Sequence, residues 1–176
     1  MGELDLKLLR DLAVQRPGVS FVLVGPTRIS EDDPVLRELS GLPNVYRLGL
    51  KPVEALPSYI QHMDVCMLPY VRNDYTRYIY PMKLHEYLAT GLPVVGTPIT
   101  ALQDFGDVVA LVTDREEWLA ALDQALRPEA RSAEASHLRQ AVAREHDWAL
   151  HAESIAKLVC RRLGPDYVER MTQLTI

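Results

Sequence analysis

This 176-residue chain has few of the residues that mark disulfide-bonded, membrane-spanning or metal-binding proteins. Its two cysteines, Cys66 and Cys160, show neither metal-ligand nor redox spacing, so we expect both to be core thiols in a reducing compartment. The five histidines form no ligand pattern, and no metal is expected. The chain also lacks an apolar run of about 18 residues and a basic-then-apolar start. These absences predict a soluble, cytoplasmic protein.

Glycine-rich phosphate loops and an excess of basic charge are missing as well. Neither a Gly-x-Gly-x-x-Gly pattern nor a Walker lysine motif occurs, which removes the main support for a dinucleotide oxidoreductase or a P-loop enzyme. Lysine and arginine together number 19 against 24 acidic residues. The resulting net charge of −5 argues against nucleic acid as a nonspecific partner.

Predicted strands and helices alternate along the chain. Near-continuous apolar runs predict buried strands over residues 21–25, 45–49, 65–69, 93–97 and 109–112. Helical patterns cover residues 4–15, 33–40, 52–62, 81–90, 116–126, 132–145 and 147–163. This order predicts an α/β fold, a Rossmann-like parallel sheet with flanking helices and a helical C-terminal part. We expect one domain over residues 1–164, followed by a tail over 165–176.

The most informative stretch covers residues 78–98, where a proline-started helix leads into a buried strand. Pro81 suits the first turn of this helix, Leu84 and Leu88 fall on one face, and Gly91 is placed to end it. The N–H groups of a first helical turn have no intrahelical acceptor and carry the positive end of the helix dipole. This end of the helix is therefore expected to attract phosphate.

Two charged residues near the start of the same helix fit a nucleotide. Lys83 adds a mobile positive charge beside the first turn, and Glu86 lies one turn further on the same side. A carboxylate there can accept hydrogen bonds from the two hydroxyls of a ribose. On spacing alone, however, a solvated surface pair worth about 0.2–0.5 kcal/mol is the commoner explanation.

Several segments together resemble the C-terminal, nucleotide-sugar-binding domain of GT-B glycosyltransferases of group 1, the bacterial envelope-polysaccharide type. The helix and its strand match the order of that site: a loop, a helix bearing a ribose-binding glutamate, then a Gly-x-Pro-Val-Val strand. The segments are residues 81–83, 86–89 and 91–95, with residues 21–26, 44–49, 56–60 and 64–69 upstream. The resemblance therefore covers most of the chain.

The resemblance implies a donor domain that binds a UDP- or GDP-sugar for transfer to a saccharide or lipid-linked acceptor. Glu86 would bind the ribose, Pro81 and Met82 would contact the donor, and Lys83 would stabilise the leaving diphosphate without a metal. The acceptor site would belong to an N-terminal domain that this chain lacks, so the chain alone is expected to be inactive. The full enzyme would be cytoplasmic, with peripheral association at the inner face of the membrane and homo-oligomer formation left open.

Two departures from the family pattern bear on these expectations. Many retaining members carry a second glutamate eight positions before the ribose glutamate, and here that position is Tyr78. Donor sugar and stereochemical outcome therefore stay open. The family domain also begins with one more strand before its first helix, so we expect an unpaired strand at the middle of the sheet.

A cluster of aromatic residues precedes the helix, because five of the eight tyrosines lie between Tyr70 and Tyr87. Tyr78 and Tyr80 are candidates to flank a base or sugar, and packing within a long loop explains them equally well. Gly25-Pro26 is expected at the carboxyl edge of the parallel sheet, where ligands bind in α/β folds. There the backbone could approach the nucleotide, or Gly25-Pro26 could form a simple turn.

Two other functions remain open on the sequence. Nucleotide-sugar epimerases with GT-B domains share the ribose glutamate and the parallel sheet. A degenerate domain that acts as an interaction module is favoured by Tyr78 and by the missing strand.

Overall fold

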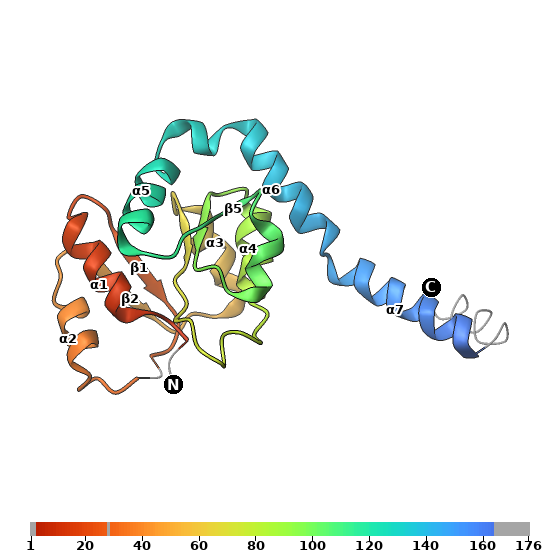
Figure 1. Cartoon of the computed structure of the whole chain (residues 1–176), viewed down its shortest axis with the longest axis horizontal. Helices are drawn as coiled ribbons and strands as arrows, with labels where there is room; N and C mark the ends of the chain where they lie inside the picture. Colours follow the sequence, from red (N-terminus) through yellow and green to blue (C-terminus); the bar gives the residue numbers. More distant parts are fainter. Residues whose placement is uncertain (1–2, 28, 164–176) are drawn as a thin grey trace.

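The structure is a computed structural model, and residues 3–27 and 29–163 are described (Figure 1). Strands and helices alternate as the sequence predicts, and helices follow the last strand. In chain order the elements are α1 (Leu6–Gln15), β1 (Phe21–Val24), α2 (Pro34–Ser40), β2 (Val45–Gly49), η1 (Val53–Ala55), α3 (Leu56–Gln61), β3 (Cys66–Leu68), α4 (Lys83–Thr90), β4 (Val94–Gly96), η2 (Thr100–Phe105), β5 (Val109–Leu111), α5 (Arg115–Ala125), η3 (Pro128–Arg131), α6 (Ala133–Glu145) and α7 (Trp148–Leu163).

The strands pair in parallel, but in two separate sheets. β1 pairs with β2, and Phe21 lies opposite Val45. β4 lies between β3 and β5, with Val94 opposite Cys66 on one side and Val109 on the other. Within the described chain no strand joins β1 to β3, so a two-stranded and a three-stranded sheet form instead of one. This agrees with the expectation of an unpaired strand at the middle of the sheet.

Adjacent residues of β4 point into two different cores, as the alternation of side chains along a strand requires. Val95 packs in the first core with α1 and α5, where Trp118 is 1% exposed. Val94 packs in the second core with Leu84 and Leu88 of α4. The three-stranded sheet is thus covered by α1 and α5 on one face and by α4 on the other, and this fixes α4 in place beside the sheet.

The last helices differ in how much they pack. α6 lies along α4, whereas α7 extends away from the body (Figure 1). No residue of α7 is buried, so the prediction that Cys160 is a core thiol is wrong. Cys66 in β3 is buried as expected, and burial raises the pKa of its thiol to about 12.

The predicted tail over residues 165–176 and its boundary at 164 lie outside the described residues. None of the helices found in residues 3–27 and 29–163 is both long enough and apolar enough to cross a bilayer.

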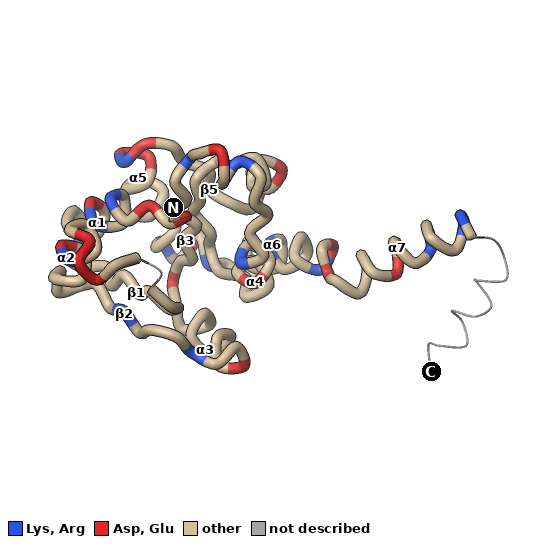
Figure 2. The backbone as a smooth tube through the Cα atoms, turned by 90° about the horizontal axis from the view of Figure 1, so that it is seen from below, with Lys and Arg blue, Asp and Glu red and all other residues tan. Residues whose placement is uncertain are grey.

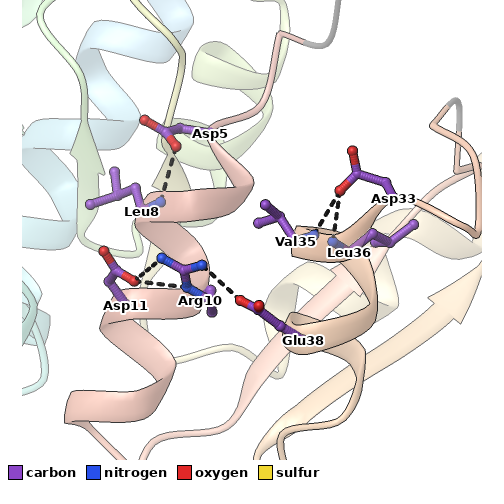
Figure 3. Close-up of polar contacts among 8 residues, drawn as sticks. All are labelled: Asp5, Leu8, Arg10, Asp11, Asp33, Val35, Leu36 and Glu38. Atoms are coloured by element: carbon purple, nitrogen blue, oxygen red, sulfur yellow. Dashed lines mark hydrogen bonds and ion pairs between the residues drawn. The ribbon is translucent and has the colours of Figure 1, made fainter.

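Carboxylates cap the first two helices (Figure 3). Asp5 accepts a hydrogen bond of 3.0 Å from the N–H of Leu8, and Asp33 accepts two, of 2.9 and 3.0 Å, at the start of α2. Arg10 of α1 donates to Glu38 of α2 at 2.7 Å. The caps satisfy N–H groups at the helix starts that have no partner within the helix. We expect them to contribute more to stability than the exposed ion pair between α1 and α2.

Charges of both signs are spread over the chain, as Figure 2 shows, with an acidic stretch leading into α2. Within that stretch Glu31 accepts a hydrogen bond of 2.6 Å from Arg47 of β2, and this contact lowers the pKa of the Glu31 carboxyl. The pair ties β2 to the segment that follows β1.

Replacing Asn44 with alanine is expected to lower the free energy of unfolding by about 1–3 kcal/mol. The buried Asn44 amide donates to the carbonyls of Ala13, Arg16 and Val19 at 2.9–3.1 Å, and these would lose their donor. Urea unfolding measures the difference. Asn44→Asp should cost at least as much, because it points an oxygen at the same carbonyls; a fully stable aspartate variant would contradict this role.

Candidate functional site

α4 turns one face to the core and the other to the surface. Leu84 and Leu88 are fully buried, and Gly91 ends the helix in the left-handed conformation with φ of 78°. The same periodicity leaves Lys83 and Glu86 exposed near the first turn. The packing predicted from the sequence is therefore confirmed.

The first turn of α4 offers two free N–H donors. The N–H groups of Leu84 and His85 donate back to the carbonyls of Pro81 and Met82, at 3.0 and 3.1 Å. Pro81 itself has no N–H, and it lies before the N-cap residue Met82 instead of inside the helix. Among the described residues, the N–H groups of Met82 and Lys83 have no acceptor. The free N–H donors are thus those of Met82 and Lys83, fewer than the predicted set over Pro81–Lys83.

Lys83 and Glu86 do not form the surface ion pair that their spacing allows. Neither side chain forms a hydrogen bond or an ion pair with any residue of the described chain. Both charges are consequently free for a ligand that carries an anion and a set of hydroxyl donors.

The loop before α4 is fixed at its base. Val71 donates its N–H to the carbonyl of Glu3 at 2.9 Å, and the hydroxyl of Thr76 donates to the carbonyl of Val71. Thr76 is fully buried and also exchanges hydrogen bonds with Asn73. The sequence did not reveal this role, because nothing local distinguishes a buried threonine from an exposed one.

The two candidate tyrosines of this loop differ in how they are held. Tyr78 is 80% exposed, and the guanidinium of Arg77 lies 5.6 Å from its ring centre. Tyr80 is half-exposed, its hydroxyl lies 2.6 Å from Nε2 of His85, and the two rings stack. Partial burial raises the pKa of the Tyr80 hydroxyl. Tyr80 is therefore positioned by α4, whereas Tyr78 projects from the loop.

Gly25 and Pro26 lie apart from this group. Gly25 has a φ of 139° and donates its N–H to the carbonyl of Gly49 at 3.0 Å, at the carboxyl end of β1. In the described chain no hydrogen bond or ring contact links Gly25 or Pro26 to α4. The structure thus brings together Tyr80, Met82, Lys83 and Glu86 but does not connect Gly25-Pro26 to them.

Two hollows in the described chain are lined by residues of η2, α6 and the three-stranded sheet, among others. One hollow of about 260 Å³ is lined by Asp104, Phe105, Asp107, Val108, Val142, Glu145 and His146. Another of about 310 Å³ lies between β4, β5, α5 and Arg139. Neither hollow includes Lys83 or Glu86. Residues 3–27 and 29–163 contain no group of three histidine, cysteine, aspartate or glutamate side chains placed to hold a metal ion.

Acidification is expected to weaken the packing of α4 through His85. Burial, followed by the nearby His146 and His151, lowers the pKa of His85 below its ordinary value of 6.5. The unfolded chain then binds more protons than the folded one, so the free energy of unfolding should fall as the pH drops below about 6.5. Urea unfolding between pH 7.5 and 5.5 measures this slope.

The matched controls for this prediction are His85→Gln and His137→Gln. The first should flatten the pH dependence, and the second, on the exposed side of α6, should leave it unchanged. An unaltered slope in His85→Gln would assign the pH dependence to other groups.

Comparisons with known proteins identify relatives over most of the chain. Residues 5–128 match the family model described as Glycosyl transferases group 1. A Bacillus subtilis (strain 168) protein, whose name assigns it to teichuronic acid biosynthesis as the glycosyltransferase TuaH, is 32% identical over 150 residues, which are 83% of this chain and 37% of that protein.

Solved structures show the same fold. Anabaena Alr3699/HepE, in complex with UDP-glucose, is 20% identical with a TM-score of 0.72, over 87% of this chain and 44% of that one. The α,α-trehalose 6-phosphate synthase of Burkholderia multivorans is 16% identical with a TM-score of 0.67, over 96% of this chain and 40% of that one. The predicted fold class is confirmed, and the chain spans about two fifths of the length of these relatives.

Proposed function

Because the chain belongs to the Glycosyl transferases group 1 family, we propose that it binds the nucleoside-diphosphate sugar in sugar-nucleotide-dependent glycosyl transfer. UDP is the nucleotide we favour over GDP, since the HepE structure of the same fold contains UDP-glucose. The acceptor would be a saccharide or a lipid-linked saccharide, as the teichuronic acid relative suggests.

The observation that carries this proposal is the free first turn of α4, which lies within the matched residues 5–128. Two N–H donors, an unpaired ammonium and an unpaired carboxylate gather there within five residues of the described chain. A positive helix end suits a diphosphate, and a carboxylate suits the neighbouring ribose hydroxyls.

Each residue has a distinct part in the proposed site. The N–H groups of Met82 and Lys83 and the Lys83 ammonium would bind the diphosphate and stabilise its charge as the glycosidic bond breaks. Glu86 would accept hydrogen bonds from the ribose, and Tyr80 would flank the base or sugar. This stabilisation is electrostatic, so no metal is part of the proposal. An acceptor site and any catalytic base would lie outside this chain, which would bind donor without transferring sugar.

The exposure of Lys83 and Glu86 supports a second candidate. A degenerate domain that acts as an interaction module would also present exposed, unpaired charges outside the two hollows described above. Such a module would bind no nucleotide.

Calorimetric titration with UDP, GDP, ADP and uridine separates the two candidates. We expect saturable binding of UDP, weakened by Lys83→Met for UDP but not for uridine, because the lysine acts on the phosphates. Lys7→Met on α1, another exposed lysine, is the matched control. A folded sample that binds no nucleotide would overturn the donor-site proposal in favour of the interaction module.

A further inference from the structure

One half-buried cation holds the C-terminal end of α4. The guanidinium of Arg139, on α6, donates to the carbonyl of Gly91 and to that of Ala130, both at 2.8 Å. The hydroxyl of Ser136 donates to the same Gly91 carbonyl at 3.0 Å. No carboxylate of the described chain pairs with Arg139, and burial lowers the pKa of its guanidinium.

Partial burial of the Arg139 guanidinium costs some desolvation energy, and no ion pair offsets it in the described chain. Its contribution is to orient the backbone, because a planar guanidinium fixes the direction of both carbonyls. It ties α4, η3 and α6 together at one point.

The close approach of α6 depends on Gly91. A Cβ atom at this position would lie 3.0 Å from the Cβ of Ser136, and its φ of 78° is one that other residues rarely adopt. At the end of α4 the backbone of Gly91 therefore packs directly against the side chain of Ser136 on α6.

The same helix also contacts α4 near its start. The ring of His146, which follows α6, stacks on His85 with ring centres 4.7 Å apart. Phe105 packs against both rings, and the ring of Tyr80 lies 5.6 Å from that of His85, centre to centre. The loop tyrosine, α4 and the end of α6 thus form one continuous stack.

These contacts hold α4, a short helix, at both ends. α4 has eight residues, which corresponds to about 12 Å, so a tilt released at either end would move Lys83 and Glu86 relative to a ligand. A misplacement of about 1 Å in a binding site can have a large effect on function.

We propose that α6 is a bracket for α4, and that Arg139 and His146 are positioning residues for nucleotide binding although neither touches the nucleotide. The inference rests on the proposed function of α4. It assigns the helical segment beyond the matched residues 5–128 a part in the donor site.

The test compares Arg139→Met with Arg144→Met, an exposed arginine on the same helix. Two quantities are measured on the full chain: the affinity for UDP, and hydrogen exchange of the α4 amides over residues 84–88 without ligand. We expect Arg139→Met to speed exchange in α4 and to weaken UDP binding roughly two- to thirtyfold, the range for residues that act on a site without touching its ligand. Arg139→Lys should recover part of the affinity, since an ammonium can serve one of the two carbonyls.

The outcomes separate the two proposals. A variant that loses thermal stability but keeps wild-type UDP affinity and α4 exchange would overturn the bracket and leave Arg139 a purely structural residue. Absence of UDP binding by the wild type would overturn the donor site, and the exchange comparison would still decide the bracket. Ser136→Ala, which removes one hydrogen bond, applies the same test if Arg139→Met fails to fold.

Discussion

Replacing Glu86 with glutamine is expected to weaken UDP binding by roughly tenfold or more, the effect of losing a charge-assisted hydrogen bond. The side chain is exposed and unpaired in the described chain, so its removal disturbs no other contact and reports on the ligand alone. Calorimetry with UDP and uridine should show the loss with both, because Glu86 is proposed to act on the ribose. Glu54→Gln, an exposed glutamate of η1, is the matched control.

A second ligand sharpens this prediction. If Glu86 binds the ribose, 2′-deoxy-UDP should bind the wild type more weakly than UDP, and Glu86→Gln should reduce that difference. Additive losses in this cycle would mean that Glu86 and the 2′-hydroxyl do not interact.

The largest expected effect on stability comes from Trp118. Its side chain is 1% exposed at the centre of the first core, between α5, α1 and β4, and Trp118→Ala would leave a large cavity there. We expect the free energy of unfolding to fall by about 3–5 kcal/mol. Urea unfolding followed by circular dichroism measures it without relying on tryptophan fluorescence.

The chain supplies a matched control in its other tryptophan. Trp148, at the start of α7, is 74% exposed, so Trp148→Ala should change the free energy of unfolding by less than about 0.5 kcal/mol. Equal losses in the two variants would contradict the description of α7 as a helix that extends away from the core.

Features with a local cause were predicted from the sequence with good accuracy. The strands follow their apolar runs to within about a residue at each end. The helix predicted over residues 116–126 is found as α5, where Asp114 and Glu117, three positions apart, form a capping box. The site helix was found for the same reason, because the leucine spacing fixes its buried face and Gly91 its end, although it begins at Lys83 and not at Pro81.

Features that depend on distant segments were not predicted. Asn44 is buried through hydrogen bonds to carbonyls 25 to 31 positions away, and its own neighbours carry no sign of it. Arg139 reaches a carbonyl 48 positions away. The short helix η2 over Thr100–Phe105 was missed as well, since two 3₁₀ turns are too short to show a clear hydrophobic period.

Nuclear magnetic resonance titration of the amide-labelled chain with UDP tests the central claim most directly. The account predicts that the largest shift changes fall on the N–H groups of Met82 and Lys83, the two free donors of the first turn, with smaller changes through Glu86. Saturable changes centred instead on the hollow of Asp104, Asp107 and His146, or no changes along α4, would contradict it.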